Sequence, residues 1–157
     1  MIRAGPSATV LVLGLLPAGL VAQATTGVGV AAVAVASDPW FVGGGLQSAF
    51  PLGDLMRVSA LGAIGTRAGA VEGRGELSLQ LVFDPTLTKP VTWYAGGGLA
   101  LRAGSTTDGF LLLVGGIEGR GRGRDRWWIE TGVGGGARFA LGYRWHRAPK
   151  KSGRSRP

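Results

Sequence analysis

Few residues in this sequence have the type and spacing that catalysis requires. The single histidine, His146, is the only imidazole available as a general base, and the serine nearest to it in sequence is Ser152. Glu72 and Glu76 form a pair of carboxylates, but four residues of an extended strand span ~13 Å. That is beyond the ~5–9.5 Å that separates the two carboxyl groups of glycosidases. We therefore expect ion pairing for the glutamates, a solvated histidine and no enzyme activity.

Ligand-binding motifs are equally sparse. The chain has no cysteine and one histidine, which excludes a structural zinc site, so we expect no metal and no cofactor. The glycine triplets at 43–45, 96–98 and 134–136 lack the strand–loop–helix setting of a phosphate-binding loop. The arginine–glycine run at 119–126 has the composition of RNA-binding repeats. Because the N-terminus described next indicates export, we interpret this run as a solvated turn and expect no nucleic-acid partner.

The first 24 residues have the features of a secretory signal peptide. Arg3 precedes an uncharged apolar run at residues 8–21, and Ala22-Gln23-Ala24 supplies the small residues of a cleavage site. Fourteen residues of helix rise only about 21 Å, short of the ~30 Å hydrocarbon core, so a membrane anchor is the weaker interpretation. Cleavage after Ala24 leaves one domain at residues 25–145 and a basic, disordered tail at residues 146–157, which holds five Lys and Arg residues and no acid.

The domain is organised by an alternation of side chains with a period of two, which is the pattern of β-strands. It is clearest at residues 71–83, V-E-G-R-G-E-L-S-L-Q-L-V-F. There the polar face holds Glu72, Arg74, Glu76, Ser78 and Gln80, and the apolar face includes Leu77, Leu79, Leu81 and Phe83. Turn residues predict eight strands, at residues 26–36, 40–50, 55–66, 71–83, 91–102, 109–118, 126–133 and 137–145, with a polar loop at 103–108. The last two segments form either a hairpin at the glycine turn or one bent strand, and no helix is expected.

The composition of the two faces indicates which one is inside. The face opposite the leucines consists of Gly, Ala and Ser with sparse Arg and Glu, whereas the wet face of a soluble barrel is dense in Lys and Glu. Small residues suit the narrow interior that eight strands enclose, and lipid then contacts the leucine face. We predict an all-β fold, a single antiparallel up-and-down eight-stranded transmembrane β-barrel. The alternative is a soluble secreted lipocalin-like β-barrel that binds a small apolar ligand.

Three segments carry a family resemblance: Y-A-G-G-G-L-A-L at 94–101, G-G-I-E-G-R at 115–120 and the final aromatic strand R-F-A-L-G-Y-R-W at 138–145. With the signal peptide and eight short strands, they look similar to the small outer-membrane β-barrels of the OmpA/OmpX type. The resemblance implies the outer membrane of a diderm bacterium, contact with outer-membrane lipid and the barrel insertion machinery, and a non-enzymatic protein that is structural or at most weakly permeable. Two features depart from the family, because 12 residues follow Trp145 and every loop is short.

The charged residues of the inward face are expected to form a network in the lumen. Ions enclosed by a barrel lose hydration, so each needs an opposite charge or hydrogen-bond donors. The expected members are Glu72, Arg74, Glu76, Arg102, Glu118, Arg120, Glu130 and Arg138. Arg57 and Arg144 are two further inward cations, which we place near the rims and in contact with water. Such a network fills the lumen and leaves at most a narrow, anion-preferring path.

Outward aromatic residues are expected at the membrane–water interfaces. The set is Trp40, Phe50, Phe83, Trp93, Trp127, Tyr143 and Trp145. With eight strands, all except Trp40 gather at the end of the barrel that carries both termini, and Trp40 lies at the opposite rim. The same topology places both termini in the periplasm, within reach of peptidoglycan or anionic lipid for the basic tail, and we expect a monomer.

Overall fold

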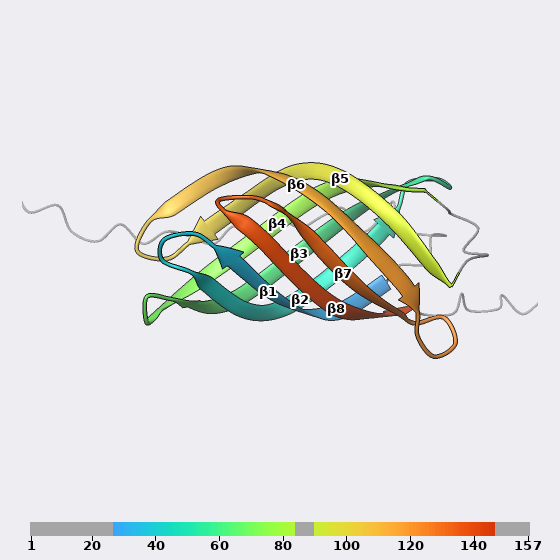
Figure 1. Cartoon of the computed structure of the whole chain (residues 1–157), viewed down its shortest axis with the longest axis horizontal. Coiled ribbons are helices and arrows are strands. Elements are labelled where there is room, and N and C mark those ends of the chain that lie inside the picture. The colour runs from blue at the N-terminus through green and yellow to red at the C-terminus, as the bar shows by residue number, and fades with distance from the viewer. Residues whose placement is uncertain (1–26, 84–89, 147–157) are drawn as a thin grey trace, which may run out of the picture.

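The computed structural model describes residues 27–83 and 90–146, so the predicted signal peptide, the segment 84–89 and tail residues 147–157 lie outside the described residues. Eight antiparallel strands close into a barrel, in which β1 pairs with both β2 and β8 (Figure 1). The strands are β1 Gly27–Ala36, β2 Phe41–Pro51, β3 Met56–Arg67, β4 Ala70–Val82, β5 Val91–Ala103, β6 Thr107–Arg120, β7 Arg126–Val133 and β8 Ala137–His146. The predicted fold class is confirmed. Within the described ranges, no helix is long and apolar enough to cross a membrane.

Each strand lies within two residues of its predicted bounds. The largest difference is in β6, because its ladder with β5 continues to the pair of Ala103 and Thr107. The expected polar loop is therefore a short turn, and Asp108 belongs to the strand. The glycine triplet at 134–136 forms a hairpin turn between β7 and β8. Gly135 and Gly136 have φ angles of 76° and 144° there, which favour glycine.

The alternation of inward and outward side chains along each strand determines which residues fill the barrel. In β4, Leu77, Leu79 and Leu81 are exposed on the outside, whereas the polar side chains at the even-numbered positions are buried in the lumen: Arg74, Glu76, Ser78 and Gln80. The lumen also has an apolar side, where residues of β1, β2 and β3 pack against Trp128 and Ala140: Ala31, Val33, Val35, Phe41, Leu61 and Ala63. The polar residues thus line one part of a lumen that apolar side chains fill elsewhere.

Two glycines of β5 allow it to approach β4 closely. A Cβ atom at Gly98 would lie 1.9 Å from the carbonyl oxygen of Leu77, and one at Gly96 would lie 2.3 Å from that of Leu79. Both distances are far below van der Waals contact, and the obstructing atoms belong to the backbone. The glycine-rich segment of β5 is therefore required by the packing of the barrel wall.

Candidate functional site: a charged lumen inside an apolar wall

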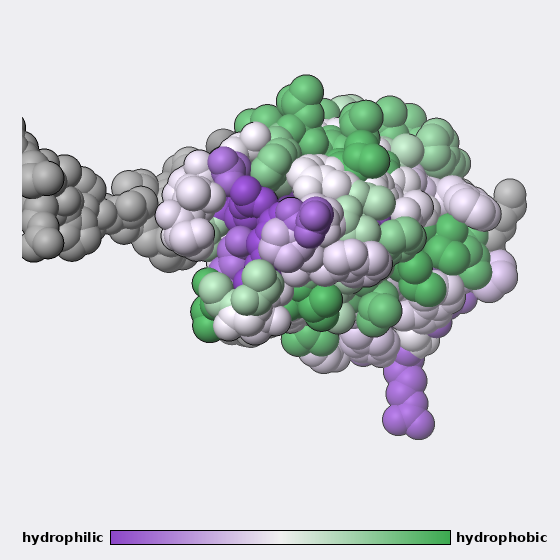
Figure 2. Space-filling view, turned by 60° about the vertical axis from the view of Figure 1, so that its left-hand side comes forward, coloured by the Kyte–Doolittle hydropathy of each residue, from purple (hydrophilic) through white to green (hydrophobic). Residues whose placement is uncertain are grey.

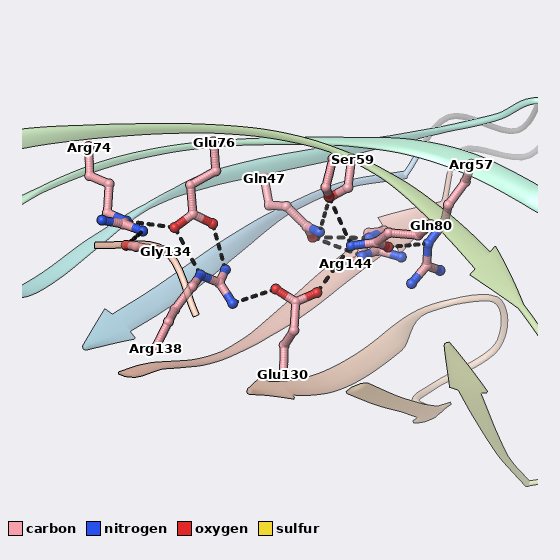
Figure 3. A network of polar contacts seen from close by, with 11 residues as sticks. Gln47, Arg57, Ser59, Arg74, Glu76, Gln80, Glu130, Gly134, Arg138 and Arg144 are labelled. Atoms are coloured by element: carbon pink, nitrogen blue, oxygen red, sulfur yellow. Dashed lines mark hydrogen bonds and ion pairs between the residues drawn. The ribbon is translucent and has the colours of Figure 1, made fainter. Parts of the chain in front are cut away.

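The middle of the lumen holds a group of ion pairs, the central cluster, which consists of Arg74, Glu76, Glu130 and Arg138 (Figure 3). Glu76 Oε1 accepts hydrogen bonds from Arg74 Nε at 2.6 Å and from Arg138 Nε at 2.8 Å. Glu76 Oε2 lies 2.7 Å from Arg138 Nη2, so Arg138 grips the carboxylate at two points. Arg138 Nη1 lies 2.5 Å from Glu130 Oε1, and Arg74 Nη2 donates to the Gly134 carbonyl at 2.8 Å. Two arginines are balanced by two glutamates.

A second group lies towards the end of the barrel where β1 begins and β8 ends. This terminal-end cluster consists of Arg57, Glu118 and Arg144. Both arginines contact Glu118 Oε2, Arg57 through Nη1 and Arg144 through Nη1 at 3.4 Å. Neutral amides accept further hydrogen bonds from both arginines. Gln47 Oε1 accepts from Arg144 Nη2 at 2.9 Å, and Gln80 Oε1 accepts from Arg57 Nε at 2.8 Å (Figure 3). Two positive charges therefore share one carboxylate.

A third group, the loop-end cluster, lies at the opposite end and consists of Arg67, Glu72, Arg102 and Asp108. Its ion pairs to Glu72 are longer, at 3.8 Å from Arg67 Nη1 and 4.0 Å from Arg102 Nε. Arg102 Nη2 also contacts Asp108, and its guanidinium lies 5.4 Å from the Phe110 ring centroid. Figure 2 shows a hydrophilic area at this end, bordered by hydrophobic surface. This cluster is partly open to solvent.

The structure changes three predicted placements. Arg57 and Arg144 are buried instead of lying in water at the rims, because both side chains turn into the lumen and contact Glu118. Arg120 is exposed at the end of β6, where its ladder partner is Arg126, because β6 continues past the lumen-facing residues. The other seven residues of the predicted network all belong to the three clusters.

Several residues of the network were not predicted. Gln47 Nε2 donates to Ser59 Oγ at 2.8 Å. Gln80 links the terminal-end and central clusters, because its Nε2 donates to Glu130 Oε2 at 3.1 Å. The period-two pattern places both glutamines on the inward face, but β2 alternates too weakly for Gln47 to be recognised from sequence. Asp108 was missed because it falls in the segment that we expected to be a loop.

The described part of the chain was predicted to hold no metal site and a solvated histidine. His146 is the last residue of β8 and is half-buried, not solvated beyond the strand, because the ladder with β1 extends to its pair with Gly27. Among residues 27–83 and 90–146, no three His, Asp or Glu side chains gather in a way that could hold a metal ion.

The outer wall of the barrel is apolar. In the eight described strands, no outward position holds a charged residue, and large aliphatic side chains are exposed on every strand, for example Val30, Leu46, Ile64, Leu79, Leu99, Leu111, Ile129 and Leu141. An apolar groove of about 930 Å³ crosses this wall from Phe83 and Trp93 to Val42.

The strand topology brings six of the seven outward aromatic residues to the terminal end. Phe83 N–H donates to the Trp93 carbonyl at 3.0 Å. Trp127 is the ladder partner of Tyr143, and Tyr143 and Trp145 stack edge to face at 5.6 Å. Phe50 lies next to the end of β2 at the same rim. The exposed Trp40 lies in the β1–β2 loop at the opposite end.

No protein-family model matches the sequence, and no curated protein matches it. Solved structures do. The crystal structure of Neisserial surface protein A matches with a TM-score of 0.57 and 14% identity over 77% of this chain and 95% of that chain. The designed barrel TMB2.3 matches with a TM-score of 0.56 and 15% identity over 81% of this chain and 98% of that one. The N-terminal β-barrel domain of Pseudomonas aeruginosa OprF matches with a TM-score of 0.47 and 13% identity over 78% of this chain and 100% of that one.

At these identities the likeness concerns the fold. The chain has the fold of the small eight-stranded outer-membrane β-barrels, as the sequence resemblance predicted.

Proposed function

We propose that this protein is a non-enzymatic β-barrel of the outer membrane of a diderm bacterium, structural or at most weakly permeable, with a lumen closed by charged side chains. The observation that carries the proposal is the division of the barrel into an apolar outer wall without charged residues and an interior where Arg and Glu pair. This division is the reverse of that in a water-soluble protein, because here the apolar groups lie on the outside and the charged groups are buried. In lipid each group is in a favourable place.

The dimensions of the wall fit a bilayer. The 13 residues of β4 extend ~43 Å at ~3.3 Å per residue, and a strand tilt of roughly 45° reduces this to about 30 Å along the barrel axis. The ring of aromatic residues at the terminal end would then lie at one membrane–water interface, with Trp40 near the other. The lipocalin-like alternative is disfavoured, because an apolar ligand does not fit a lumen that holds Arg138 and Arg144.

The proposed orientation follows from the even number of strands. The start of β1, the end of β8, the β2–β3 turn and the β6–β7 turn lie at one end of the barrel, and we assign this end and both chain termini to the periplasm. The signal peptide would deliver the chain there, and the barrel insertion machinery would place it in the membrane as a monomer. The basic tail would contact peptidoglycan or anionic lipid by charge attraction. A tag fused after Pro157 should then be inaccessible to surface labelling of intact cells.

Fractionation tests the location, and conductance tests the closed lumen. The protein is expected in the outer-membrane fraction, to need detergent for extraction and to migrate differently on a gel when boiled. Recovery as a freely soluble periplasmic protein would refute the membrane assignment. In planar bilayers we expect no large, stable conductance from the purified barrel, and a pore-sized conductance would refute the closed lumen while leaving the location intact.

A further inference from the structure

The terminal-end cluster carries an excess of buried positive charge. Arg57 and Arg144 are 7% and 1% exposed, and Glu118, the carboxylate that they share, is 4% exposed. The other groups that accept hydrogen bonds from these arginines, Gln47 and Gln80, are neutral. The cluster therefore has one more positive than negative charge. Burial of such a charge without a counter-charge is strongly unfavourable.

Unpaired hydrogen-bond donors lie in the same part of the lumen. Six buried side-chain atoms have no hydrogen-bond partner among the described residues, and four of them are donors on residues around this cluster: Arg57 Nη2, Thr92 Oγ1, Tyr94 Oη and Trp128 Nε1. The other two are Arg138 Nη1, which lies 2.5 Å from Glu130 Oε1, and His146 Nδ1. Thr92 and Trp128 are the ladder partners of Glu118 on its two sides. The Arg57 guanidinium lies 4.4 Å from the centroid of the Tyr94 ring. Buried donors are normally satisfied, so this concentration of unsatisfied ones requires an acceptor.

We propose that this end of the lumen binds one small monovalent anion with the charge and size of chloride. An anion there supplies the missing negative charge and accepts hydrogen bonds from the unpaired donors. A water molecule can accept the hydrogen bonds but leaves the charge unbalanced. Arg126, the half-buried ladder partner of Arg144, increases the positive potential further. The inference depends on the lumen alone, so it holds whichever membrane contains the barrel and whether or not the barrel conducts.

Chloride binding can be measured on the purified protein in detergent micelles, with chloride exchanged for gluconate at constant ionic strength. We expect the folded barrel to broaden the ³⁵Cl NMR resonance. We also expect the thermal midpoint of unfolding to rise saturably as chloride replaces gluconate, because an anion that binds only the folded state stabilises it. No line broadening and identical midpoints in the two salts would overturn the proposal and leave water as the occupant.

The Gln47→Glu variant replaces the anion with a side chain. The new carboxylate would lie beside Arg144, since Gln47 Oε1 is 2.9 Å from Arg144 Nη2. Ser59, whose hydroxyl now accepts from Gln47 at 2.8 Å, can donate instead. We expect this variant to fold and to lose the chloride dependence. If the thermal midpoint of this variant depends on chloride as strongly as that of the wild type, the proposed site is wrong.

Tyr94→Phe tests the unpaired hydroxyl. A hydrogen bond to an anion is worth enough that its loss should lower the apparent chloride affinity about tenfold, and an unchanged affinity would contradict the site as proposed. Arg102→Gln is the matched control, because it removes an arginine from the loop-end cluster at the other end of the barrel. It should keep the wild-type chloride response, and loss of the response in this variant would place the anion at the loop-end cluster and overturn the proposal.

Discussion

The central and loop-end clusters use the same kinds of residues in different surroundings. In the central cluster Glu76 contacts two arginines at 2.6–2.8 Å, and every member is buried. In the loop-end cluster the Arg102 and Asp108 side chains are 19% and 39% exposed, and the contacts to Glu72 are 3.8 and 4.0 Å long. Exposed pairs contribute little to stability because water screens them, whereas breaking a buried pair leaves an unpaired charge in a dry site.

The comparison assigns different roles to the two clusters. The central cluster spans the lumen from β4 to β7 and β8, so it connects opposite walls of the barrel (Figure 3). The loop-end cluster links only neighbouring strands, β3, β4, β5 and β6. Disruption of the first cluster should therefore affect both stability and permeability, and disruption of the second should affect neither strongly.

The largest expected effect is that of Glu76→Ala. Arg74 and Arg138 would lose their shared carboxylate, although Arg138 keeps Glu130 and Arg74 keeps the Gly134 carbonyl. We expect a loss of about 3 kcal/mol in the free energy of unfolding, at the low end of the range for broken buried pairs. Urea-induced unfolding in lipid vesicles measures this loss, and planar bilayers show whether conductance appears.

Glu76→Gln is the matched control, because the amide keeps the size of the side chain and one acceptor oxygen. Glu76→Gln should lower the free energy of unfolding by less than Glu76→Ala does, but by more than any substitution in the loop-end cluster. If both Glu76 variants unfold at the same urea concentration as the wild type, the central cluster does not stabilise the barrel and the comparison fails.

A smaller effect is expected in the wall next to the central cluster. In Gly98→Ala the new methyl group would lie 1.9 Å from the Leu77 carbonyl oxygen, so β4 and β5 must move apart, at a cost of roughly 1–3 kcal/mol. In the control Gly75→Ala, no heavy atom lies within 4 Å of the added Cβ. We expect this control to be neutral or slightly stabilising. Equal midpoints for the two variants in urea would show that the wall is not tightly packed.

The sequence was sufficient for the fold because alternation is a local property. The contrast between Leu77 or Leu79 and Glu76 identifies both the strand and its inner face from sequence. It also placed Glu118 and Glu130 inside. Which arginine pairs with which glutamate is a property of register and strand tilt. Those depend on all eight strands together, so the pairing of Glu76 with Arg138, 62 residues away, could not be predicted.

The burial of Arg57 and Arg144 could not be predicted for the same reason. Arg57 and Arg144 lie near the ends of β3 and β8, and we therefore expected them to contact water at the rims of the barrel. Strand ends reach different heights in a tilted barrel, and long arginine side chains extend inward from them. Burial of these two residues, and with it the charge excess beside Glu118, becomes visible only when the strands are assembled.

Glu72→Ala in the loop-end cluster provides the counterpart to Glu76→Ala on the same strand. Arg67 and Arg102 would lose a carboxylate at 3.8 and 4.0 Å, but water and Asp108 can solvate them. We expect a loss of less than about 1 kcal/mol in the free energy of unfolding. A loss as large as that of Glu76→Ala would mean that exposure does not separate the two clusters.

The smallest expected effect is a salt dependence that distinguishes the two glutamates. The Debye length falls from ~10 Å at 0.1 M salt to ~3 Å at 1 M, so the partly exposed pairs of Glu72 should be screened and the buried pairs of Glu76 should not. The stability difference between wild type and Glu72→Ala should therefore shrink by a few tenths of a kcal/mol as salt rises, whereas that of Glu76→Ala should stay constant. Sodium gluconate is the appropriate salt, because it varies ionic strength without chloride and so keeps this measurement independent of anion binding at the terminal end. A parallel decline of both differences would show that water and ions reach the central cluster, and the lumen would then be open.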